Sequence, residues 1–272
     1  MPDTNLTDAP RGAVVSPSSV SDLPNVAPCS TLSRRAPLKW IRLGARDIRQ
    51  ALFPSLSYGL LLTLCGYFVV YVAFTFGNVF SVMALASGFI LLGPMVAMTF
   101  YEISRQLQEG AKPGLLHSLR CSLAHVGEQM VFALILLVIF LIWARAVSMI
   151  HVFLPINSQA SHAEFALFLG IGTGVGSLFA VLVFCISAFS LPMIVAKKTD
   201  SITAVVTSIN AVLRNKGAMG LWALLIVIAV GFGLLTGFLG FVVTLPLIGH
   251  ATWHAYQETI NASAWPEHTC AF

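Results

Sequence analysis

The residues best suited to chemistry lie near the end of the chain, in the segment GHATWHAYQE. His250, His254 and Glu258 follow one another at intervals of one helical turn, so a helix would place them on one face. Two imidazoles one turn apart can ligate a metal ion, and a carboxylate can complete the ligand set. The same side chains can instead anchor a helix end among water and lipid headgroups, or handle protons or substrate. The metal therefore stays unknown, with His250 and His254 as the candidate ligands, and no cofactor is favoured.

A second polar group follows the apolar stretch that contains Pro94. Glu102 and Arg105 are three residues apart, a spacing that permits a local ion pair on a helix. An ion pair across helices, with the histidine face, is the alternative. The two groups together form our candidate functional cluster: Tyr101, Glu102, Arg105, His250, Trp253, His254, Tyr256 and Glu258.

The composition indicates the environment in which these residues must work. Of the 272 residues, 57% are hydrophobic and only 10% are charged, whereas soluble domains are about 25% charged. A water-soluble fold could not bury so much apolar surface. The chain also contains no HExxH sequence, no nucleophile elbow and no soluble region large enough for a separate active site. We therefore expect a membrane protein without enzymatic activity.

The apolar stretches are long enough for about six spans. About 20 apolar residues cross a hydrocarbon core of roughly 30 Å. The last two spans come from one apolar run that we divide at its glycines, and five spans, with the last one long or tilted, is the alternative. The expected spans are residues 52–76, 79–100, 129–150, 165–196, 218–236 and 238–257.

Prolines and amphipathic segments repeat around these spans. Pro94, Pro192 and Pro246 fall in the second, fourth and sixth spans and predict kinks there. Residues 37–50 alternate an apolar stripe with Lys39, Arg42, Arg46 and Arg49, which is typical of a helix lying in the membrane interface beside anionic headgroups. Further amphipathic segments begin near Leu115 and Ile202. The pattern predicts an all-α, polytopic helical membrane protein: three hairpins with interfacial amphipathic helices.

Four glycines alternate along the fourth span, at positions 170, 172, 174 and 176. The run lies inside an apolar stretch without the strand–turn–helix context of a phosphate loop. Small residues let helices approach closely in lipid, so we expect close helix packing here.

The distribution of cations predicts the orientation. In the six-span layout every Lys and Arg except Arg145 falls on one side, and this basic side is expected to be cytoplasmic. We therefore expect a multi-pass protein of a bacterial cytoplasmic (inner) membrane, with a cytoplasmic N-terminus. The expected division is a disordered cytoplasmic tail at residues 1–36, a helical membrane domain at 37–258 and a C-terminal tail at 259–272.

Three stretches of this sequence resemble a known family. They are Ser57-Tyr58-Gly59, Gly93-Pro94 followed by Tyr101-Glu102, Ser104-Arg105, Leu107 and Gly110, and GHATWHAY at residues 249–256. They are similar to a family of predicted bacterial integral inner-membrane proteins of unknown function, some of which are labelled cytochrome c oxidase subunit I-like. The resemblance covers roughly residues 38–258 and implies an inner-membrane location and a helical architecture, with no established activity.

Three functions remain as hypotheses. The first is a non-catalytic membrane protein that acts through the lipid bilayer, a membrane-protein partner or a second copy of itself, and does not bind nucleic acid. The second is a small transporter or permease-like protein that uses the proline-kinked helices. The third is a metal- or haem-binding redox membrane protein that uses the face of His250 and His254.

Overall fold

The computed structural model describes residues 24–75, 96–123, 126–153 and 161–268. These residues are helical apart from turns, connecting segments and two isolated β-bridges, so the all-α prediction is confirmed for the described chain. A helical segment at residues 96–108 follows the first gap. The remaining helices are α1 (Ala36–Gln50), α2 (Leu52–Thr75), α4 (Leu115–Leu123), α5 (Val126–Phe153), α6 (His162–Ser187), α7 (Ser190–Ala196), α8 (Ser201–Arg214), α9 (Lys216–Leu235) and α10 (Phe241–Thr259).

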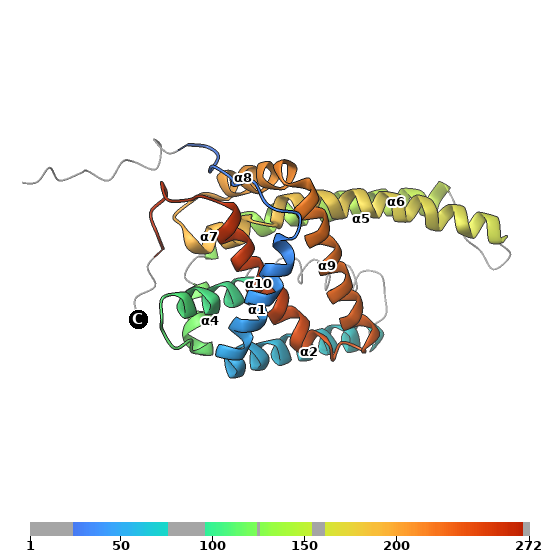
Figure 1. The fold of residues 1–272 in the computed structure, drawn as a ribbon. Helices are drawn as coiled ribbons and strands as arrows, with labels where there is room; N and C mark the ends of the chain where they lie inside the picture. The colour runs from blue at the N-terminus through green and yellow to red at the C-terminus, as the bar shows by residue number, and fades with distance from the viewer. Residues whose placement is uncertain (1–23, 76–95, 124–125, 154–160, 269–272) are drawn as a thin grey trace, which may run out of the picture.

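The helices divide into a packed end and a projecting hairpin. Helices α5 and α6 run side by side and extend away from the rest, while α1, α2, α7 and α9 pack against α10 in the packed end (Figure 1). The largest fully buried side chains include Trp40, Trp222, Trp253 and Phe189, which belong to one buried core cluster. Leucines and valines on α5 and α6, such as Leu134 and Leu178, are exposed. An exposed apolar surface such as that of α5 and α6 is expected of helices that face lipid.

Four stretches are long and apolar enough to cross a membrane: Leu52–Thr75, Gly127–Ile150, His162–Ala196 and Lys216–Leu235. They correspond to the first, third, fourth and fifth predicted spans. Most of the second predicted span, with Pro94, lies outside the described residues. The sixth forms a helix, α10, but is not among the four candidate spans. The exact six-span arrangement therefore stays a prediction.

The fourth predicted span is interrupted near its end. Helix α6 ends at Ser187 and α7 begins at Ser190, so the break precedes Pro192. Pro192 is the third residue of α7, where its missing N–H has no partner to lose within that helix. All seven residues of α7 are buried.

Helix α10 lies at the centre of the packed end, against α1 and α2. Glycines allow this close approach. A Cβ on Gly44 of α1 would lie 2.8 Å from the backbone nitrogen of Ala251. A Cβ on Gly59 of α2 would lie 2.4 Å from the carbonyl oxygen of Val242. That carbonyl is four residues before Pro246, which has no N–H to donate to it. Pro246 thus leaves the carbonyl oxygen of Val242 without its usual helical hydrogen bond, and Gly59 lies close to that oxygen.

The glycines of α6 behave differently. A Cβ at position 170, 172, 174 or 176 would meet no atom within 4 Å. The close packing expected from this stripe is therefore not made within the described chain.

Both chain ends contact the helices where they are described. Residues 1–23 and 269–272 lie outside the described residues. The N-terminal segment hydrogen-bonds through Ser30 N to the carbonyl of Thr259, and Leu32 N to the side chain of Asn215. Lys198 N donates to the carbonyl of Pro266 in the C-terminal segment. The domain boundaries expected at residues 36 and 258 stay predictions, and residues 24–35 and 260–268 pack on the helical body.

Gly59→Ala should destabilise the protein by about 1–3 kcal/mol, because the added methyl group meets backbone and the Pro246 ring rather than a flexible side chain. Gly66→Ala, on the same helix, is the matched control, because its methyl group would lie 3.6 Å from the Phe238 ring. Thermal unfolding of the detergent-solubilised protein measures both. Equal melting temperatures for the two variants would contradict the close α2–α10 contact.

Candidate functional site at the centre of the packed end

Five polar side chains from four helical segments meet around the middle of α10. Ser55 comes from α2, Asp47 from α1, Ser104 from the helical segment 96–108, and His250 and His254 from α10. His250, Ser55 and Ser104 are 0% exposed, and Asp47 is 6% exposed. This group is called the junction cluster below.

The junction cluster is joined by four hydrogen bonds. Ser55 Oγ lies 2.9 Å from His250 Nε2, and Ser104 Oγ lies 2.7 Å from His250 Nδ1. Ser104 Oγ also donates to Asp47 Oδ2 at 2.7 Å. His254 Nε2 lies 2.8 Å from the same carboxylate oxygen. The chain of bonds runs from Ser55 through His250, Ser104 and Asp47 to His254.

The chemistry of each group sets the direction of these bonds. A serine hydroxyl has one proton, and Ser104 gives it to Asp47, so Ser104 accepts from His250 Nδ1–H. A neutral His250 then has Nε2 free to accept from the Ser55 hydroxyl. His254 donates from Nε2 to the carboxylate. With this tautomer every member of the chain is satisfied, as a buried polar network requires.

The predicted ion pair between Glu102 and Arg105 is present in its local form. Arg105 Nε and Nη2 bind the two oxygens of Glu102 at 2.9 and 2.8 Å, a bidentate geometry. Arg105 Nη1 donates to Glu109 at 3.0 Å. The hydrogen-bonded Glu102 carboxylate raises the pKa of Arg105. Arg105 therefore binds Glu102 and Glu109 and not the histidine face. His250 and His254 bond instead to other members of the junction cluster.

The rest of the predicted cluster is also used in packing. Trp253 Nε1 donates to Gln108 Oε1 at 3.0 Å, and Glu258 Oε2 accepts from Trp40 Nε1 and Lys39 Nζ, both at 3.0 Å. Tyr101 and Tyr256 are buried. These contacts tie α10 to α1 and to residues 96–108.

The geometry bears on metal binding. Within the described ranges, no group of three or more His, Cys, Asp and Glu is placed to hold a metal ion. Both ring nitrogens of His250 face serine hydroxyls, and Nε2 of His254 faces Asp47. The two imidazoles share α10 but bind different partners rather than a common point.

The sequence analysis gave Asp47, Ser55 and Ser104 no place in the candidate site, although Ser104 lies in one of the stretches that resemble the family. Asp47 carried a usable signal: it is the one acidic residue in an otherwise basic amphipathic segment, and its position falls with Trp40 and Gly44 on the side now seen to be buried. The two serines carried no such signal, because isolated serines are common in apolar helices.

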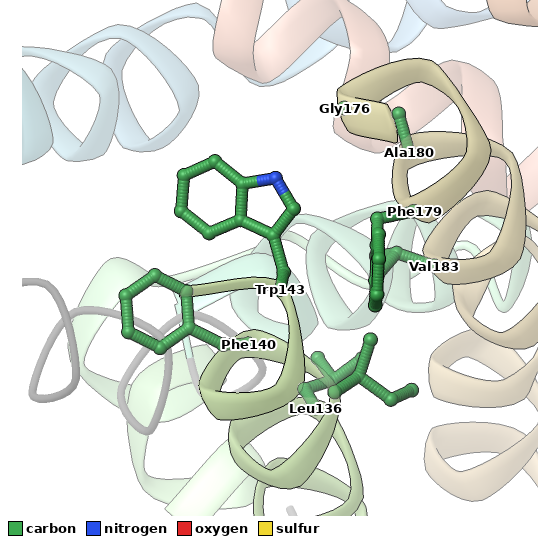
Figure 2. A pocket seen from close by; sticks show the side chains of 8 residues that line it. Leu136, Phe140, Trp143, Gly176, Phe179, Ala180 and Val183 are labelled. Carbon is green, nitrogen blue, oxygen red and sulfur yellow. The ribbon is translucent and has the colours of Figure 1, made fainter. Parts of the chain in front are cut away.

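Two cavities lie outside the junction cluster. An apolar cavity of about 340 Å³ separates α5 from α6, with Trp143 and Leu136 on one side and Gly176, Phe179 and Ala180 on the other (Figure 2). A polar cavity of about 230 Å³ is bordered by Arg105, Trp253, Glu267 and neighbouring residues. Glu267 is paired with Lys197, which lowers the pKa of Glu267.

The helices, their apolar surfaces and the four long apolar stretches define a helical integral membrane protein. Residues 82–196 match the model of a family described as predicted integral membrane protein (DUF2189), whose function is unknown. The match confirms the resemblance for this part of the chain, while the GHATWHAY segment lies outside it. No curated protein and no solved structure matches the chain.

Ser104→Ala should lower the free energy of unfolding by about 1–3 kcal/mol, because it removes the shared partner of two buried groups, His250 Nδ1–H and Asp47 Oδ2. Ser148→Ala on α5 is the control: its exposed hydroxyl bonds only the carbonyl of Ala144, and the change should stay within about 0.5 kcal/mol. Thermal or chemical unfolding in detergent compares the two. If Ser104→Ala were as mild as the control, the junction cluster would not be stabilising.

Proposed function

We propose that this chain is a non-catalytic multi-pass protein of a bacterial cytoplasmic membrane, which acts through lipids or a membrane partner. One observation carries the proposal: the polar residues most suited to chemistry hydrogen-bond one another in a buried cluster. A catalytic group must reach its substrate. Ser104 and His250 are 0% exposed and Asp47 is 6% exposed, so these three groups are largely shielded from solvent.

The proposed arrangement in the membrane has six spans in three hairpins. The first hairpin of this proposal is α2 with the second span expected from the sequence, most of which lies outside the described residues. The second is α5 with α6, and the third is α9 with α10. The contacts between α5 and α6 and between α9 and α10 support it. The cations outside the apolar stretches support a cytoplasmic N-terminus, because they gather on one side in this arrangement.

The orientation can be tested with reporter fusions. Fusions after Lys112 and after Lys198 should both be active with a reporter that works in the cytoplasm. A fusion after Ser161, in the connection between α5 and α6, should be active only with a reporter that works outside it. Opposite compartments for Lys112 and Lys198 would contradict the arrangement.

The absence of transport and redox chemistry is tested on the purified protein. Detergent-purified protein should contain no stoichiometric metal and no haem absorption band, and proteoliposomes should show no protein-dependent flux across a panel of ions and small solutes. Bound metal or haem that is lost in both His250→Ala and His254→Ala would support the redox hypothesis. Flux that Pro246→Ala changes would support a permease.

A further inference from the structure

Helix α1 has a buried face and an exposed basic face. Trp40, Gly44, Asp47 and Ile48 are buried against the rest of the packed end. The side chains of Arg42, Arg46 and Arg49 are exposed. At about 100° per residue these arginines lie on the side of the helix opposite the buried face. The row of three is called the arginine row below.

Contacts with α10 fix the rotation of α1 about its own axis. Trp40 Nε1 donates to Glu258 at 3.0 Å near the start of α1, and Asp47 binds His254 at 2.8 Å near its end. Between them, Gly44 lies against the backbone of α10. The helix backbone that carries the arginine row is therefore already positioned before a partner binds, which lowers the entropy cost of binding.

The charge of the arginine row is not neutralised by the described chain. Lys39 of α1, which is outside the arginine row, forms an ion pair with Glu258. No arginine of the row forms an ion pair with a described carboxylate. The one acidic residue of the helix, Asp47, is buried and bonded to His254 and Ser104. The row is left as a line of positive charge.

Exposed apolar side chains flank this line of charge. Leu38 on α1 is 54% exposed, and Leu52 and Phe53 at the start of α2 are 54% and 79% exposed. Helix α1 runs at an angle to α2 in Figure 1. A helix with an exposed basic face and neighbouring apolar side chains is typical of the membrane interface. Guanidinium groups beside apolar side chains match a phosphate headgroup above its acyl chains.

We propose that the arginine row binds the headgroups of anionic phospholipids, with Leu38, Leu52 and Phe53 entering the adjoining acyl region. This inference rests on the proposed function, since it names the lipid class through which the protein would act. The row carries charge complementary to such lipids, and each cation near an anionic surface adds to the attraction.

The test is native mass spectrometry of the full chain in detergent, with equal amounts of phosphatidylglycerol and phosphatidylcholine that carry the same acyl chains. The wild type should retain the anionic lipid preferentially. The triple variant Arg42→Gln, Arg46→Gln, Arg49→Gln should lower the ratio of bound anionic to zwitterionic lipid by about tenfold. Added salt should weaken the wild-type preference, because exposed charges are screened.

The matched control is Arg120→Gln, Lys198→Gln, Arg214→Gln, which removes the same charge from exposed positions elsewhere. Its lipid ratio should stay within about twofold of the wild type, since these residues lie outside α1. Equal losses in both triple variants, or no wild-type preference, would overturn the proposal.

Two further binding experiments distinguish anionic lipid from other negatively charged ligands. Glycerol phosphate that displaces the lipid completely would show recognition of free phosphate and overturn the lipid assignment. Binding of an oligonucleotide lost only in the α1 variant, without a lipid preference, would also overturn it. The lipid-binding experiments do not measure flux or cofactor content, so a negative result would leave the non-catalytic proposal standing. Flux in proteoliposomes would overturn the non-catalytic proposal separately.

Discussion

A carboxylate held away from water needs hydrogen-bond donors, and Asp47 finds them on two other helical segments. Ser104 and His254 both donate to one of its oxygens. Leaving a buried charge without partners costs several kcal/mol, so these donors must be present for α1 to pack where it does. His250 then extends the same network to α2 through Ser55. The positions of α1, α2, residues 96–108 and α10 are linked through this one requirement.

The network also changes the interpretation of the GHATWHAY segment. Each of its conspicuous residues has a packing partner: a Cβ on Gly249 would lie 2.6 Å from Phe100, Ala251 meets Gly44, and Trp253 bonds Gln108. Histidines at helical spacing are compatible with metal binding and with internal hydrogen bonding, and the partners decide between them. Here the described partners are two serines and an aspartate.

Patterns within the sequence predict the helical class, most of the helix positions and the local Glu102–Arg105 pair, because helix periodicity and apolar length are local properties. They do not predict the partners of His250 and His254, because tertiary packing brings Ser55, Ser104 and Asp47 to α10. The buried face of α1 shows the same limit. The amphipathic pattern of residues 37–50 predicted an interfacial helix, but it did not show that Gly44 and Asp47 would be buried against other helices. Asp47 can occupy the buried face of α1 because His254 donates a hydrogen bond to it, and Gly44 can do so because the backbone of α10 lies close to it.

The separation of these partners along the chain has a consequence for biosynthesis. Asp47 and His254 are 207 residues apart, so α1 leaves the ribosome long before its main packing partner exists. Until α10 is made, Asp47 lacks its His254 partner, and burying its carboxylate would be costly, so the carboxylate must stay hydrated. The packing of α1 is therefore completed only after α10 has been synthesised, and a chain that stops before α10 leaves α1 without its main packing partner.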